Sequence, residues 1–312
     1  MPRVLPTFLF ITIGLEVIIR WFFLRSLLPP YLAIQTTGVS VYLLFSISVA
    51  LGALITTFVI YGKAGLGQLL GRLKPSVPSG EVIWLVVSPL FLIPLLEIIC
   101  LVFRKEHIEL AFPAVVNLWG SSITGYLWHT PIDLITTLFS LLLATGLEEI
   151  AWRGFVLPHL QVNQGAFRAN LILSLIATAT HIVLYPSLLL GAPKIFFEIL
   201  IIGIILTSIY NSSGGYLLPT TAFHFLINLY AGRGVTIAEM SPNIVSRELL
   251  LVLFNPFFFL PYLLLESEGQ RSIFIFLYSV WMLITAIVVC KRYGLTKLSR
   301  SDQVGNYFLQ SE

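Results

Sequence analysis

The feature that most limits how this chain can fold is a series of apolar runs, each near the length that crosses a bilayer. A helix needs about 20 mostly apolar residues to span the hydrocarbon core. Only 11% of the 312 residues are charged, whereas a soluble domain carries about 25%. We therefore predict an all-α, polytopic membrane helix bundle that forms one integral membrane domain over residues 1–312.

The apolar runs set the expected number of spans. Basic residues at Lys63, Arg72 and Lys74 and again in the C-terminal tail from Lys291 favour the cytoplasmic side for both segments. Two segments on one side need an even number of spans between them, whereas seven runs separate them. Either one run does not cross or the short stretch near Trp119 does, and we predict about eight spans. The runs are Thr7–Arg25, Val39–Tyr61, Val82–Phe103, Ile132–Val156, Arg168–Tyr185, Pro193–Tyr210, Tyr216–Tyr230, Leu249–Leu265 and Ser272–Cys290, with a shorter apolar stretch at Phe112–Trp128.

Composition also limits the classes of binding partner that this chain is expected to have. The formal net charge is +3, and no basic stripe with interleaved aromatic residues is present, so nucleic acid is not an expected partner. The two cysteines, Cys100 and Cys290, form no metal-type pair. Membrane lipids are the expected surroundings, and a plasma membrane of the bacterial type is the expected location.

Two adjacent carboxylates, Glu148 and Glu149, lie near the end of the apolar run that begins at Ile132. An ionisable group at this depth costs about 2.5–3.5 kcal/mol even on insertion scales, so it is expected to have a partner or a function. Arg153 is four residues after Glu149, and the two can pair on one helix face. Glu148 is rotated by about 100° from Glu149 and remains available to act.

Two later stretches carry groups that complement these carboxylates. His181 lies in one predicted helix, and His224 and Asn228, four residues apart, share a face of another. At 1.5 Å per residue, Glu148, His181 and His224 lie about 15, 20 and 13 Å from the same side of the membrane. We therefore predict that these side chains converge on one buried polar site.

This set of motifs resembles the CPBP intramembrane proteases, the CAAX protease and bacteriocin-processing (ABI) family, which includes the type II CAAX prenyl endopeptidases. The family pattern is Glu-Glu-x-x-x-Arg, then Phe-x-x-x-His, then His-x-x-x-Asn, each on a membrane helix. The chain matches it at the six positions above, but Ala177 stands where the family has Phe. The resemblance covers residues 131–230, the expected catalytic core, and implies an intramembrane endopeptidase.

The chemistry assigns a role to each of these residues. Glu148 is the expected general base for a water molecule, and His181 shares that water and later gives a proton to the leaving amine. His224 and Asn228 would stabilise the oxyanion, while Glu149 and Arg153 hold the local geometry. A metal alternative uses the same side chains, because Glu148, His181 and His224 could be the three ligands of a catalytic zinc. We favour the metal-free form, since no His-Glu-x-x-His motif is present.

Three classes of function fit such a chain. The leading hypothesis is an endopeptidase acting on a membrane-associated protein or peptide, including a prenylated CAAX-type tail. A non-catalytic immunity or scaffold protein of the same fold is the second, because fold alone does not settle function. A proton-coupled transporter is the third, because buried Glu, His and Arg also form proton relays.

Overall fold

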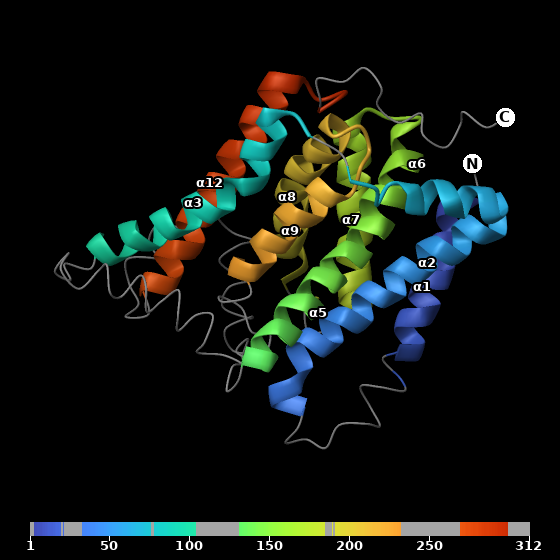
Figure 1. Cartoon of the computed structure of the whole chain (residues 1–312), viewed down its shortest axis with the longest axis horizontal. Helices are drawn as coiled ribbons and strands as arrows, with labels where there is room; N and C mark the ends of the chain where they lie inside the picture. The colour runs from blue at the N-terminus through green and yellow to red at the C-terminus, as the bar shows by residue number, and fades with distance from the viewer. Residues whose placement is uncertain are drawn as a thin grey trace.

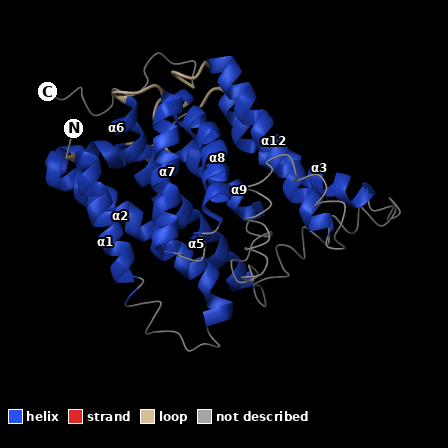
Figure 2. Cartoon of the chain, turned by 180° about the vertical axis from the view of Figure 1, so that it is seen from behind, coloured by secondary structure: helices blue, strands red, loops and turns tan. Residues whose placement is uncertain are grey.

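The computed structural model describes residues 3–19, 21, 33–75, 78–103, 131–184, 189, 191–231 and 269–298. Within these ranges every regular element is a helix, and no strand is present, which confirms the predicted all-α class (Figure 2). The elements are α1 (Val4–Ile19), α2 (Ala33–Gly71), α3 (Gly80–Phe103), α5 (Pro131–Glu149), the π-helix η2 (Ile150–Val156), α6 (Leu157–Gln161), α7 (Ala166–Leu184), α8 (Ala192–Ser212), α9 (Leu218–Ala231) and α12 (Gly269–Tyr293).

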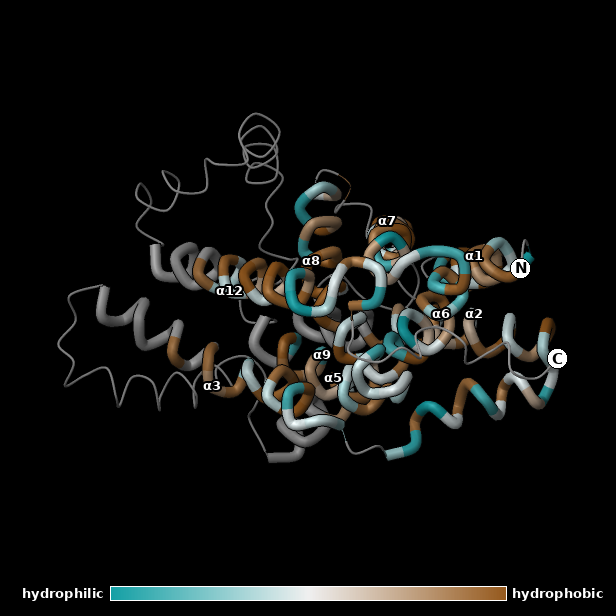
Figure 3. The backbone as a smooth tube through the Cα atoms, turned by 90° about the horizontal axis from the view of Figure 1, so that it is seen from above, coloured by the Kyte–Doolittle hydropathy of each residue, from teal (hydrophilic) through white to brown (hydrophobic). Residues whose placement is uncertain are grey.

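Three of the described helices are long and apolar enough to cross a membrane by themselves: Leu43–Gly71 within α2, Ala166–Val183 within α7, and α8. Large apolar side chains such as Phe10, Phe91 and Leu175 are exposed on the outside of the bundle, and hydrophobic positions recur along the helices in Figure 3. Such exposure suits lipid contact rather than water. The predicted stretches Phe112–Trp128 and Leu249–Leu265 lie outside the described residues, so the count of eight spans stays a prediction.

One end of the bundle brings together segments far apart in sequence (Figure 1). The Leu217 amide donates to the Arg72 carbonyl, which joins the end of α2 to the start of α9. The Ala166 amide donates to the Thr296 carbonyl, so the segment after α12 caps the start of α7. Both segments predicted to be cytoplasmic therefore lie at the same end of the described structure.

Two turns in the bundle depend on glycine. Gly62 interrupts α2 with φ 64°, and this kink turns the last part of the helix across the end of the bundle. Gly214 and Gly215, with φ 73° and 84°, make the tight turn between α8 and α9. Positive φ is the conformation that glycine adopts without the cost other residues meet, and these turns direct the helices that carry the site.

The site helix α5 lies between two neighbours. It packs against α2 on one side and α9 on the other, and the views in Figures 1 and 2 agree. A hydrophobic core that includes Phe8, Phe45 and Phe155 surrounds η2, and a second core joins α8, α9 and α12. The apolar packing therefore holds the end of α5 and all of η2 inside the protein rather than against lipid.

The contact between α7 and α8 depends on Gly203 of α8, which has no side chain. Asn170 of α7 donates to the Leu200 carbonyl and accepts from Thr207 Oγ1. A Cβ at Gly203 would overlap the Asn170 amide. We predict that Gly203→Ala lowers the stability of the bundle by about 1–3 kcal/mol, as overpacking does.

The measurement is thermal unfolding of the purified protein in detergent, compared with Gly67→Ala. Gly67 is also helical but has open space where a Cβ would go, so that variant should unfold at or slightly above the wild-type temperature. Equal unfolding temperatures for the two variants would contradict the close α7–α8 packing.

Candidate active site

The paired glutamates lie where the helix changes its winding. Glu148 and Glu149 end α5, and the next seven residues form the π-helix η2, in which the Leu157 amide donates to the Trp152 carbonyl. Single π-helical turns inside α-helices occur frequently at functional sites. Pro158, just beyond η2, has no N–H and removes one donor from the helix ladder, which gives a sequence-level reason for the irregular winding.

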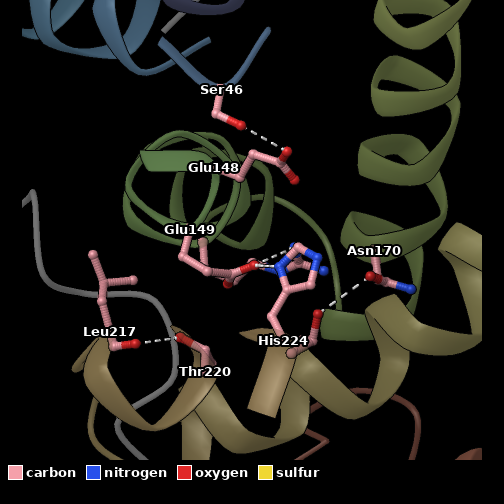
Figure 4. A network of polar contacts seen from close by, with 9 residues as sticks. Ser46, Glu148, Glu149, Asn170, Leu217, Thr220 and His224 are labelled. Atoms are coloured by element: carbon pink, nitrogen blue, oxygen red, sulfur yellow. Dashed lines mark hydrogen bonds and ion pairs between the residues drawn. The ribbon is translucent and has the colours of Figure 1, made fainter. Parts of the chain in front are cut away.

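The Glu149 carboxylate is fully buried and bound from two sides. Its Oε1 accepts a hydrogen bond from Arg153 at 3.0 Å and lies 2.7 Å from Nδ1 of His224. Figure 4 shows the Glu149 and His224 side chains pointing toward each other. The predicted Glu149–Arg153 pair is confirmed, and the contact with His224 is an addition that the sequence analysis did not foresee.

The contact with Glu149 also fixes the hydrogen on one ring nitrogen of His224. A carboxylate that accepts from Arg153 is ionised and can only accept, so Nδ1 of His224 carries the proton. A carboxylate on Nδ1 sets the tautomer and the orientation of the ring. Nε2 of His224 is the nitrogen left for chemistry.

Glu148 leaves the same helix in another direction. It is 4% exposed and accepts a hydrogen bond from Ser46 Oγ of α2 at 3.0 Å. Figure 4 shows the two glutamates diverging, Glu148 toward α2 and Glu149 toward α9. This agrees with the rotation of about 100° between consecutive helical residues. The neutral hydroxyl of Ser46 leaves Glu148 in a different setting from Glu149, which has a cation beside it.

His181 meets the same turn of α2 as Glu148. Its ring lies 4.4 Å, centroid to centroid, from the ring of Phe45, the residue next to Ser46. Its Nδ1 is 2.7 Å from the Ala177 carbonyl, and because a carbonyl only accepts, Nδ1 carries the hydrogen. The lone pair of the neutral imidazole is therefore on Nε2. Phe45 supplies from α2 an aromatic contact to His181, while Ala177 stands at the family's Phe position.

Asn228 completes the predicted set on α9. It lies four residues past His224 in the same continuous helix, on the same face and about 6 Å further along the axis. The side chains of His224 and Asn228 are half-buried. The structure therefore brings Glu149, Arg153 and His224 into direct contact. Glu148 and His181 contact the adjacent α2 residues Ser46 and Phe45.

Among the described residues, no three His, Cys, Asp or Glu side chains form a group that could hold a metal ion. Glu148, His181 and His224 are all described, and His224 directs Nδ1 to Glu149. The metal-free form therefore stays a proposal, and Nε2 is the remaining nitrogen of His224.

Two contacts of the site come from residues that the motif search passed over. Phe45 and Ser46 belong to the apolar run Val39–Tyr61, and both are buried. A serine inside such a run is a weak signal, because hydroxyls often bond to their own helix, as Ser48 does with the Phe45 carbonyl. Only the packing of α2 against α5 identifies Ser46 as the partner of Glu148.

The fold and the site are those of a polytopic membrane protein with a buried carboxylate–histidine centre. Residues 129–230 match the family described as type II CAAX prenyl endopeptidase Rce1-like. A curated relative, CAAX prenyl protease 2 of Methanococcus maripaludis, is 25% identical over 242 residues, which cover 72% of this chain and 83% of the relative. The resemblance is thus confirmed: over residues 129–230 the chain is similar to the Rce1-like family. This similarity supports intramembrane endopeptidase activity in general.

The different settings of the two glutamates predict different effects on stability. Glu149→Gln leaves the Arg153 cation buried without its carboxylate, and removing one partner of a buried pair costs about 3–5 kcal/mol. Glu148→Gln keeps a group that can still accept from Ser46, so its unfolding temperature should stay near that of the wild type. Thermal unfolding of both variants in detergent checks this. An equal loss of stability in both would show that Glu148 is also part of the buried ion pair.

Proposed function

We propose that the protein is an intramembrane endopeptidase in which Glu148 activates a water molecule. The observation that supports this most strongly is that the two adjacent glutamates have different partners. Glu149 is bound by a cation and an imidazole, whereas Glu148 accepts from a serine hydroxyl, and His181 contacts Phe45, the residue next to that serine. One carboxylate is used in structure, and the other keeps the capacity to take a proton.

In the proposed reaction, Glu148 takes a proton from water as the oxygen attacks the peptide carbonyl carbon. Nε2 of His181 accepts a hydrogen bond from the same water on its other side. This nitrogen is available because the Ala177 carbonyl binds the other ring nitrogen, Nδ1. As the C–N bond breaks, the proton passes through His181 to the leaving nitrogen. The products are a carboxylic acid and an amine, and the enzyme returns to its starting state.

The negative charge that develops on the carbonyl oxygen needs donors held in place beforehand. His224 fits this role because Glu149 holds Nδ1 and fixes the ring, and a ring that also carries a hydrogen on Nε2 can donate to the oxyanion. Asn228 offers the Nδ2 hydrogens of its amide from the next turn of α9. Arg153 does not touch substrate in this scheme and acts by holding Glu149 ionised.

The substrate we propose is a membrane-associated protein or peptide whose cleaved bond enters the bundle from the bilayer. A prenylated CAAX-type tail is the first candidate, since the curated relative carries the name CAAX prenyl protease 2. The lipid anchor would keep the peptide at the membrane, and one such chain gives only reversible binding. The basic residues at the end of the bundle with Lys63 and Lys297 favour a cytoplasmic approach.

We predict that Glu148→Gln abolishes cleavage without unfolding the protein. A general base contributes about 10²–10⁴-fold to the rate, so kcat should fall by at least that factor. The measurement uses purified protein in proteoliposomes and a fluorogenic peptide with a farnesylated CAAX-type tail, next to the same peptide without lipid. Glu81→Gln, which removes a carboxylate that bonds to Tyr293 near the end of the bundle, is the matched control. Full activity of Glu148→Gln beside an active wild type would overturn the assignment.

The metal-free form makes a separate prediction. Activity should persist after treatment with a strong zinc chelator, and elemental analysis should find far less than one zinc per active chain. The physical reason is that Glu148 and His181 activate water through proton transfer rather than through a Lewis acid. Loss of activity on chelation, restored by added zinc, would instead support Glu148, His181 and His224 as ligands.

A further inference from the structure

Arg72 has a position that its sequence context does not suggest. It is the first residue after α2 and lies between the exposed cations Lys63 and Lys74 in the sequence, where a solvated surface residue is expected. Its side chain instead turns inward, and the residue is 7% exposed. Its NH1 donates to the Gly154 carbonyl of η2 and to the Tyr210 hydroxyl of α8, both at 2.6 Å.

The Gly154 carbonyl lies one turn before a residue that cannot donate a hydrogen bond. In an α-helix it would accept from the amide of the residue four positions later, but that residue is Pro158, which has no N–H. A buried carbonyl left without its donor is costly. A guanidinium donor forms a charge-assisted bond, stronger than a neutral one. Arg72 therefore stabilises the backbone of η2 at the point where Pro158 weakens the helix.

The same residue ties η2 to the helix that carries His224. The Arg72 carbonyl accepts from the Leu217 amide at 2.9 Å, immediately before α9. The lack of a side chain at Gly154 makes this close approach possible, since a Cβ there would lie 3.0 Å from Leu69 and 3.2 Å from Leu217. One residue thus joins the end of α2, η2 and the start of α9.

We propose that Arg72 is a positioning residue for the reaction, acting through η2 and α9 to set the distance between Glu148 and His224. This inference rests on the proposed function. Glu148 and Glu149 directly precede η2, and Arg153 precedes the carbonyl that Arg72 binds. Reacting groups must be held in a near-attack geometry, and a displacement of about 1 Å can cost about 10²-fold in rate. Arg72 does not touch the substrate.

The test compares Arg72→Met, Arg72→Lys and Tyr210→Phe with Lys74→Met, a control that removes an exposed cation two residues away. For Arg72→Met we expect kcat per folded molecule to fall about 10–100-fold with KM within about twofold, because alignment is lost and binding is kept. Arg72→Lys should recover part of kcat, since an ammonium can still donate to one acceptor. Tyr210→Phe should lose less than Arg72→Met, and Lys74→Met should match the wild type.

Hydrogen exchange supplies a readout that does not need cleavage. Amides of residues 150–161 should exchange at least about tenfold faster in Arg72→Met, as expected where a local segment opens more easily, and at the wild-type rate in Lys74→Met. Unchanged exchange would overturn the inference, as would an Arg72→Met protein with wild-type kcat per folded molecule. If the wild type cleaves neither test peptide, the proposed function fails, while exchange still decides whether Arg72 holds η2.

Discussion

A single buried oxygen atom holds the parts of this site together. Glu149 Oε1 accepts from Arg153 on its own helix and from His224 on α9, so the α5–η2 helix and α9 are joined by charge inside an apolar bundle. A charge in such surroundings is costly unless it is paired and hydrogen-bonded. Because Arg153 and His224 both satisfy this need at Glu149, the carboxylate of Glu148 is left to a neutral serine. The same interaction thus separates a structural glutamate from a reactive one.

Because α5 lies between α2 and α9, the adjacent side chains of Glu148 and Glu149 have different surroundings. Consecutive helical residues point about 100° apart, so neighbouring carboxylates reach different helices. The α2 turn at Phe45 and Ser46 contacts both His181 and Glu148, although α2 lies about a hundred residues or more earlier in the chain. The π-helix follows Glu149 directly. Pro158 removes a backbone donor next to it, and Arg72 donates to the Gly154 carbonyl within it.

Sequence reasoning reached the parts of the site that depend on spacing within one helix. The Glu149–Arg153 pair and the shared face of His224 and Asn228 follow from helical periodicity. The contacts between helices did not follow, because hydropathy identifies spans without saying which are neighbours. Ser46 and Phe45 were therefore missed. Arg72 was used only as a basic residue favouring the cytoplasmic side, and its buried contacts with Gly154 and Tyr210 were missed as well. The π-helix was missed as well, although Pro158 after the motif is a local signal for a disturbed helix.

The central claim is that Glu149 holds His224 through Nδ1 and thereby leaves Glu148 free to act. The most direct measurement is the ¹⁵N NMR spectrum of the His224 imidazole in the wild type and in Glu149→Gln, with the signal assigned by a His224→Gln variant. Our account predicts that Nδ1 of His224 carries the hydrogen in the wild type and that this preference weakens once the carboxylate is removed. A His224 ring with an unprotonated Nδ1, unchanged by Glu149→Gln, would contradict it.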